Sequence, residues 1–448
     1  MAHDLASLTQ ALLAAAKRAG ADAADALAID GRSVSIDVRG GTLEQAERSE
    51  AVELGLRVLL GQRSATISAS DIRPETMEAM ATRAIAMARE APEDPYIGLA
   101  DPDALARDIQ VDALELYDPA PEPSPADLEE DAKRAEAAAM AVKGITRIDA
   151  ASAGYGASRI HLAATNGFSG GYSRSSRSTS LVAIAGEGTG MERDYDGDSR
   201  IFQTDLRSPE DIGTSAAERT LARLNPRRPK TGAYPVLFDE RVSSSLIGHL
   251  LSAINGAAIA RGGSWARDLL GKQVLPRALS LTEDPRRRRA TGSRPFDAEG
   301  LPTRQRAIVE DGILTGWTLD LATARKLGLQ STANAARAIA SGPNPSNWNI
   351  ALSQSDRSQA DLMAEMGTGL LVTSMIGATI NPNTGDYSRG AAGMWIENGV
   401  PKYPVSGVTI AGSLPEMLKT LLPANDARPW LSRVVPSLLV EGLTLAGE

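Results

Sequence analysis

Three histidines and the absence of cysteine limit the metal chemistry that this chain can support. A catalytic zinc site takes three protein ligands, most often from His, Cys, Asp or Glu. His249 lies in an apolar segment, and His3 and His161 are far from it in sequence. Its spacing from Leu246 and Ala253 places His249 on a helical stripe of core residues, which is typical of a structural histidine. The sequence therefore predicts no metal site and no catalytic residue in this chain.

A second pattern offers an alternative chemistry. Gly167-Phe168-Ser169-Gly170-Gly171 matches the G-x-S-x-G turn of α/β-hydrolases, and Asp239 and His249 follow it in hydrolase order. That turn needs a strand before it and a helix after it, whereas residues 172–179 are rich in Ser and Arg and indicate a strand or a loop. We interpret the match as a turn in a Gly-rich hairpin, and replacement of Ser169 would test the hydrolase alternative.

The run Asp194-Tyr195-Asp196-Gly197-Asp198 has the alternating carboxylates of a calcium-binding loop. In such a loop a Gly follows the third acidic position and a Glu closes the loop at the twelfth, where this chain has Asp205. The spacing fails on both counts. We interpret the run as a solvated hairpin tip.

The elements that carry these residues predict an α+β fold in two domains, since single cores stop growing near ~250–300 residues. Residues 4–19 have helical apolar spacing, with Asp4 as the N-cap, and alternating apolar residues predict strands around residues 34–38 and 52–60. Pro-rich residues 225–232 predict the boundary. It separates an N-terminal domain (1–224), with helices on an antiparallel sheet, from a strand-rich C-terminal domain (233–448).

Start and turn signals mark further elements. Ser124-Pro125 and Ser208-Pro209 each place a capping Ser before Pro, which predicts the beginning of a helix. A helix is expected from about Arg241 to Ala260, and Asn398-Gly399 between apolar runs predicts a hairpin. Residues 91–123 are rich in Pro and Asp and are expected to form a surface connection.

Charge and composition narrow the partners and the compartment. The net charge of -9 and the pI near 5.2 disfavour nucleic-acid binding, which needs a basic surface. No run approaches the ~18 apolar residues of a membrane span, and the N-terminus lacks the features of a signal peptide. Together with the absence of cysteine, these features lead us to expect a cytoplasmic protein without membrane contact.

The most specific pattern lies near the C-terminus. It combines Thr384-Gly385-Asp386-Tyr387-Ser388-Arg389-Gly390 with Trp395-Ile396-Glu397-Asn398-Gly399 and Thr409-Ile410-Ala411-Gly412. These motifs resemble the C-terminal signature of the TldD/PmbA family, and the resemblance covers nearly the whole chain, from Leu54 to Leu414. The resemblance also implies that the strand-rich C-terminal domain is barrel-like. The family contains a zinc metalloprotease subunit (TldD) and a metal-free paralogue (PmbA, also called TldE).

The resemblance implies which kind of subunit this is. In the zinc-bearing kind, the helix after the position of Phe238 carries His-Glu-x-x-x-His, and a cysteine near the C-terminus completes the site. This chain has Leu250 after His249, Ala253 and Ile254 four and five residues on, and no cysteine. It therefore resembles the PmbA/TldE kind.

That resemblance implies a role in a cytoplasmic heteromeric zinc metalloprotease that acts on unfolded or modified peptides. A TldD-like, zinc-bearing paralogue would be the heterodimer partner, and this chain, with no cofactor of its own, would form part of the substrate chamber. The alternative is a stand-alone, homodimeric binding or scaffold protein without a protease partner.

Two segments are predicted to face substrate or partner. The turn around residues 381–390 combines small residues, which admit another backbone, with polar groups that can bond an extended peptide. Its candidate residues are Asn381, Asn383, Asp386, Ser388 and Arg389. In the alternative, Asp386 and Ser388 only satisfy the backbone of their own turn. Residues 334–349 resemble a family segment, so Arg337 and Asn349 are expected to line the substrate cavity.

Overall fold

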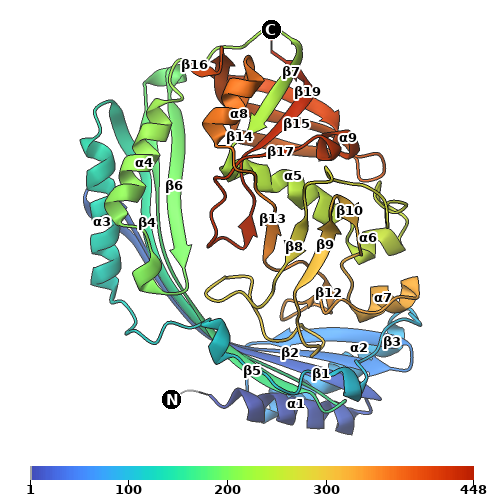
Figure 1. Cartoon of the computed structure of the whole chain (residues 1–448). Helices are drawn as coiled ribbons and strands as arrows, with labels where there is room; N and C mark the ends of the chain where they lie inside the picture. The colour runs from blue at the N-terminus through green and yellow to red at the C-terminus, as the bar shows by residue number, and fades with distance from the viewer. Residues whose placement is uncertain (1–2, 448) are drawn as a thin grey trace.

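The N-terminal half is built on one long, curved antiparallel sheet (Figure 1). The computed structural model describes residues 3–447, with the side chains of residues 378 and 379 outside the description. The strand order is β3-β2-β1-β4-β5-β6. The strands are β1 (Ala23–Arg39), β2 (Thr42–Leu60), β3 (Arg63–Ala69), β4 (Ile145–Ala164), β5 (Ser169–Ala185) and β6 (Glu192–Arg200). The predicted α+β class and the antiparallel N-terminal sheet are confirmed.

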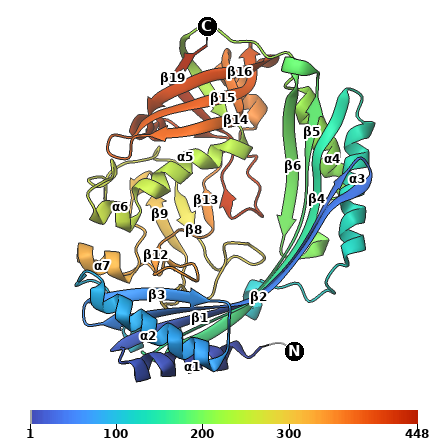
Figure 2. The same cartoon turned by 180° about the vertical axis from the view of Figure 1, so that it is seen from behind.

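Four helices cover the convex face of this sheet, two at each end (Figure 2). They are α1 (Leu5–Ala19), α2 (Pro74–Glu90), α3 (Pro125–Ala141) and α4 (Pro209–Leu221). The Asp4 side chain caps α1 by accepting from the backbone N–H groups of Ala6 and Ser7. As predicted, α3 and α4 begin at Ser-Pro pairs whose Ser hydroxyls accept from the third residue of each helix.

The alternation of side chains along β1 explains why helices cover one face of the N-terminal sheet, while the other face packs against the C-terminal half of the chain. Ala24, Ala26 and Ala28 pack with α1 and α2, and Val34 and Ile36 pack with α3. These residues share one parity, so they lie on the same face of the strand. The intervening residues lie on the other, concave face of the sheet, where Leu27 packs in a cluster with Phe296 of the C-terminal half.

The C-terminal half contains a closed five-stranded barrel, which confirms the strand-rich, barrel-like domain that the sequence pattern and the family resemblance together predicted. Strand order β16-β15-β14-β7-β19 is completed by a further pairing of β16 with β19. Its strands are β7 (Gly232–Phe238), β14 (Gly369–Ile380), β15 (Asp386–Glu397), β16 (Val400–Ser413) and β19 (Leu438–Ala446), and β17 (Leu422–Pro423) pairs with β19. The β15–β16 hairpin turns at Asn398-Gly399, as predicted.

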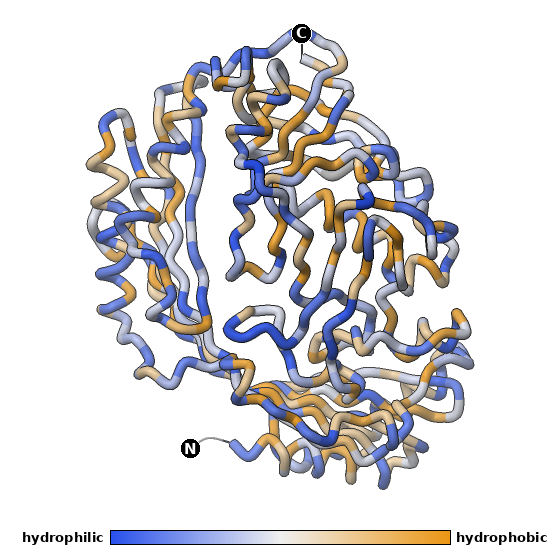
Figure 3. Tube along the Cα trace, in the orientation of Figure 1, coloured by the Kyte–Doolittle hydropathy of each residue, from blue (hydrophilic) through white to orange (hydrophobic). Residues whose placement is uncertain are grey.

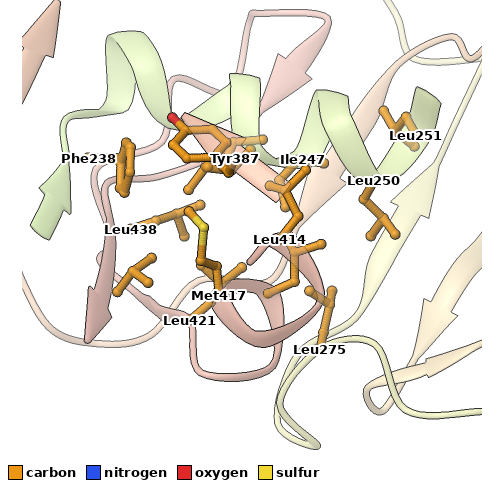
Figure 4. Packing of buried hydrophobic residues seen from close by; sticks show 14 of the residues in the cluster. Phe238, Ile247, Leu250, Leu251, Leu275, Tyr387, Leu414, Met417, Leu421 and Leu438 are labelled. Atoms are coloured by element: carbon orange, nitrogen blue, oxygen red, sulfur yellow. The ribbon is translucent and has the colours of Figure 1, made fainter. Parts of the chain in front are cut away.

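Helix α5 (Glu240–Ala253) provides much of the core of this half. Figure 4 shows Phe238, Ile247 and Leu250 converging with Tyr387 and with Leu414 of α9 (Leu414–Lys419). All of these side chains are buried. The helix that brings His249 into the fold is therefore fixed by apolar packing on one side.

A smaller sheet and short elements fill the space between the barrel and the N-terminal sheet. The smaller sheet has the order β10-β9-β8-β13-β18, and β11 pairs with β12. The strands are β8 (Leu281–Glu283), β9 (Arg306–Glu310), β10 (Ile313–Leu314), β11 (Ala335–Ala336), β12 (Asn344–Pro345), β13 (Ile350–Leu352) and β18 (Arg433–Val434). Helices α6 (Gly256–Ala260) and α7 (Leu321–Leu327) belong to this middle region, whereas α8 (Gln359–Met366) packs on the barrel. The N-terminal half also has single 3-10 turns at 102–104, 112–114, 188–190 and 203–205.

Three predictions need correction. The helix expected to run to Ala260 breaks after Ala253, because the Asn255 side chain caps a new helix. The 91–123 connection is not wholly at the surface, since Leu114 and Leu116 are buried. Both corrections reflect tertiary contacts that local patterns do not record.

The third correction concerns the acidic run, which lies on edge strand β6 and not at a hairpin tip. Asp194 and Asp196 are buried, and Asp196 is paired at 2.8 Å with both Arg207 and Arg219. Figure 3 shows β6 as hydrophilic along much of its length. Charges on an edge strand oppose pairing with another sheet.

Within residues 3–447, none of the helices has the length and apolar character that a membrane crossing requires.

Candidate functional site

His249 lies at the position where the family resemblance places zinc ligands, and its surroundings are apolar and cationic. Its ring makes an edge contact with Tyr387, with 5.9 Å between ring centroids. Its Nε2 is buried without a hydrogen-bond partner in the described part of the chain. Burial lowers the pKa of His249, and the positive charge of Arg389 lowers it further. The imidazole is therefore held neutral beside a guanidinium.

Neighbouring groups do not supply a set of metal ligands around this imidazole. Leu250 is buried in the core, and Ala253 occupies the next turn of the helix. Burial raises the pKa of Tyr387 to about 12, and its hydroxyl donates to the Met375 sulfur at 3.3 Å. Among residues 3–447, no three His, Cys, Asp or Glu side chains are grouped so that they could hold a metal ion.

Ser169 does not sit in a nucleophile elbow. It begins β5 after the turn that ends β4, so the surrounding order is strand, turn, strand. Its hydroxyl lies 3.4 Å from Nε2 of His161, the histidine on the adjacent strand, while Nδ1 of that ring contacts Thr9 at 2.9 Å. The predicted interpretation as a hairpin turn agrees with this geometry.

Five of the predicted site residues lie together on the β14–β15 hairpin. Asn381 and Asn383 are exposed, and the Asn381 side chain accepts from the Asn383 backbone N–H at 3.0 Å. The exposed Asp386 accepts from the Thr384 hydroxyl at 2.6 Å. Much of the polar capacity of this turn is thus used locally, although these side chains remain open to a partner.

The next residues of the hairpin point back toward the body of the protein. The Arg389 Nε donates to the Gly377 carbonyl at 2.7 Å, across the hairpin. Ser388 is partly buried and pairs with Ala411 in the β15–β16 register. The turn itself is tied down, since the Trp265 backbone N–H donates to the Pro382 carbonyl at 2.8 Å.

The other two predicted residues lie far from this hairpin. Asn349 is 1% exposed, and its amide donates to the Asp284 carbonyl at 2.9 Å and to the Ser293 hydroxyl at 2.7 Å. Arg337 lies between the two halves of the molecule, where its Nη1 pairs with Asp25. Asn349 therefore supports the fold around β8 and β13, whereas Arg337 lines a small cavity.

The Asp25 carboxylate is the centre of a buried ion cluster that the sequence did not reveal. Its Oδ2 accepts from Arg57 Nε at 2.7 Å, and its Oδ1 accepts from Arg337. Although burial raises the pKa of Asp25, the two guanidinium groups outweigh it and lower the pKa below its usual value. Asp25 and Arg57 are charged residues inside otherwise apolar strand patterns, and that interruption was the available signal.

The concave face of the N-terminal sheet also forms an open groove of about 490 Å³. Small and hydroxyl residues from β1, β2, β4 and β5 line most of it, and Arg32, Arg174 and Glu53 add charge. None of the seven predicted site residues lines this groove. The residue types that line the groove did not indicate a binding surface in the sequence, because Ser and Gly in a strand are typical of a solvated face.

Family comparisons agree with the resemblance found in the sequence. Models for PmbA/TldA metallopeptidase domain 1, the central domain and the C-terminal domain match residues 24–88, 118–224 and 231–447. The chain belongs to the PmbA/TldD family.

Individual relatives extend the similarity along the full length. Metalloprotease PmbA of Escherichia coli O157:H7 is 38% identical over 417 residues, which is 93% of this chain and 90% of that protein. A crystal structure from Bacteroides thetaiotaomicron, described as a proposed modulator of DNA gyrase, gives a TM-score of 0.92 at 28% identity over all of both chains. TldE from Thermococcus kodakarensis shares the fold, with a TM-score of 0.84 at 20% identity, covering 98% of this chain and 99% of that one.

Proposed function

We propose that this chain is the metal-free, PmbA/TldE-like subunit of a cytoplasmic heteromeric zinc metalloprotease that acts on unfolded or modified peptides. In this proposal a TldD-like paralogue supplies the zinc and forms a heterodimer with this chain. The chain contributes part of the chamber in which the peptide is held.

The observation that carries the proposal is the environment of His249. A zinc ion needs several anionic or neutral ligands around it, and a fixed cation beside a site opposes binding of a dication. Arg389 is such a cation, since its positive charge lowers the pKa of His249. The side chains that follow on the helix, Leu250 and Ala253, have no ligand atoms, so the described residues around His249 do not fit zinc.

The concave groove and the β14–β15 hairpin support a role in holding peptide. Small residues such as Gly156 and Ser158 let a second backbone approach the sheet closely, and hydroxyl groups offer hydrogen bonds. At the hairpin, Asn381, Asn383 and Asp386 present exposed polar atoms to a partner or a peptide. The two surfaces would line different walls of one chamber.

The test is co-purification with a TldD-like paralogue, followed by a peptidase assay with and without chelator. We expect a stable complex and chelator-sensitive cleavage by the pair, with no cleavage by this chain alone. A chain that forms only a homodimer in the presence of the paralogue would instead support a stand-alone binding or scaffold protein.

A further inference from the structure

A small cavity lies between the concave face of the N-terminal sheet and the C-terminal half. Its volume is about 180 Å³. One wall is apolar and comes from β1 and β4, with Phe296 opposite. The polar part of the lining consists of Arg174, Arg294, Arg337, Asp297 and Tyr172. Three guanidinium groups therefore line a cavity whose remaining lining is mainly apolar.

Arg294 has no acidic partner in the described part of the chain, where its Nε is buried and makes no hydrogen bond. Its guanidinium lies 3.3 Å from the centroid of the Trp348 ring. Burial lowers the pKa of Arg294 to about 10, so the side chain stays charged at neutral pH. A buried cation without a counter-ion is costly, and stacking on an aromatic ring offsets that cost in part.

Arg337 is also incompletely satisfied. Its side chain is 2% exposed, and Nη1 is bound to Asp25. Its Nε and Nη2 are buried without a hydrogen-bond partner among residues 3–447. Since buried donors are nearly always paired in folded proteins, two orphaned donors beside a cavity indicate an absent acceptor.

The charges around the cavity do not balance. Asp25 is shared between Arg57 and Arg337, so it neutralises at most one of them. Asp297 adds one negative charge to the lining, although its oxygens accept from the backbone amides of Glu299, Leu301 and Ala335 and form no ion pair with an arginine of the described residues. With Asp297 counted, the two carboxylates of Asp25 and Asp297 still face the guanidinium groups of Arg57, Arg174, Arg294 and Arg337. Arg174 donates to the carbonyls of Thr291 and Ser293, which carry no charge. An excess of positive charge remains.

From these contacts we infer that the cavity binds an organic carboxylate that carries one small apolar group. The carboxylate would accept from Arg294 and from the free nitrogens of Arg337, and the apolar group would lie against Leu27, Ile160 and Leu162. The volume is below the ~300–1,000 Å³ of pockets for drug-sized ligands, which restricts the occupant to about one residue.

Two sources of such a carboxylate are compatible with the site. One is the C-terminus of a peptide lying in the 490 Å³ groove, because Ile29 and Arg174 line both the groove and the cavity. The other is a free acid of similar size, such as an N-acylated amino acid. The inference concerns this chain alone and does not depend on the proposed metalloprotease complex.

The experiment measures binding to the full chain by calorimetry and by tryptophan fluorescence, to which Trp348 contributes as one of the five tryptophans of the chain. The probes are N-acetyl-leucine, N-acetyl-leucinamide, and a tetrapeptide ending in leucine with either a free or an amidated C-terminus. We expect both free acids to bind and both amides to bind at least about tenfold more weakly, since hydrogen bonds to a charged group are worth ~1.5–3 kcal/mol. Tighter binding of the free tetrapeptide would assign the site to peptide ends, and equal affinity would assign it to free acids.

Variants tie the binding to the cavity. Arg294→Gln should weaken both free acids about tenfold or more, and Arg294→Lys, which keeps the charge, should weaken them less. Arg304→Gln, which changes an exposed arginine on the same connection, should leave affinity unchanged. Arg294→Gln removes an unpaired buried charge, so its thermal midpoint should not fall.

The inference is overturned if acids and amides bind equally, if neither acid binds, or if a folded Arg294→Gln variant binds them as tightly as the wild type.

Discussion

The surroundings of His249 differ in buried charge from the contact between the two halves of the molecule. We call that contact the seam and define it by the residues Asp25, Arg57, Arg294 and Arg337. Near α5, a single imidazole is kept neutral by burial and a neighbouring cation, and the nearby hairpin turn uses many of its polar atoms on itself. At the seam, the buried side chains of Arg57 and Arg337 share the carboxylate of Asp25, and Arg294, whose Nε is buried, has no ion-pair partner among the described residues. The helix that carries the family's motif position therefore holds a neutral imidazole. The seam, which carries no motif, holds buried positive charges that are not fully paired.

This difference in buried charge indicates which region of the chain to examine for a ligand-binding site. A motif identifies the family, but Leu250 and Ala253, which follow His249 on the helix, have no metal-ligand atoms. Unsatisfied charge is expensive to maintain. Its presence at the seam is therefore stronger evidence of a bound partner than the polar residues of the hairpin, and the predictions below test both sides of this comparison.

The largest effect is expected from Asp25→Asn. Removal of this carboxylate leaves Arg57 and Arg337 buried without a counter-charge, which should cost ~3–5 kcal/mol of unfolding free energy. Asp30→Asn, on the same strand, breaks a partly exposed pair with Arg159 and should cost ~0–1 kcal/mol. Chemical denaturation of both variants measures the difference, and equal losses would show that the seam cluster is not special.

A smaller loss is expected from Gly55→Ala, which tests how closely the two halves approach. A Cβ at this position of β2 would lie 2.2 Å from the Ile339 carbonyl oxygen, so the backbone must move. Overpacking of this kind costs ~1–3 kcal/mol.

Gly31→Ala is the control for this contact, because Gly31 lies in the neighbouring strand and a Cβ there meets nothing within 4 Å. Thermal melts should separate the two variants. A neutral Gly55→Ala would mean that the segment around Ile339 yields easily.

The sequence predicted local features of these regions and missed their assembly. Caps at Asp4 and Ser124 and the Asn398-Gly399 turn depend on neighbours in the chain, and all were recovered. The pairing of Asp25 with Arg337 joins residues more than 300 positions apart, and no local pattern encodes it. The burial of Asn349 was missed for the same reason.

Glu299 should give the seam a pH-dependent stability. Burial, followed by the charges of Asp297 and Asp320, raises the pKa of Glu299 well above its usual value. Its stabilising contribution is therefore complete below the unfolded pKa and is lost as pH rises through the folded pKa.

As the pH rises above the ordinary Glu pKa of about 4.3, the wild-type thermal midpoint should consequently fall relative to that of Glu299→Gln. The exposed Glu310→Gln serves as the control. Parallel pH profiles for wild type and Glu299→Gln would contradict the assignment.

The smallest effect on stability is expected at the hairpin. Asp386→Ala with Arg389→Ala removes one local hydrogen bond within the turn and one to a carbonyl, so the thermal midpoint of this subunit should change little. If the hairpin faces the partner or the chamber, the peptidase activity of the reconstituted pair should fall. A double mutant that unfolds alone yet is fully active once assembled would make the hairpin structural.

Metal content tests the central claim most directly. The chain, purified without a His tag, is analysed for zinc by mass spectrometry, alone and after assembly with a TldD-like paralogue. The account predicts no stoichiometric zinc in the isolated chain and zinc in the assembled pair, because His249 stands beside Arg389 without further ligands. One tightly held zinc per isolated chain, lost on His249→Ala, would contradict it.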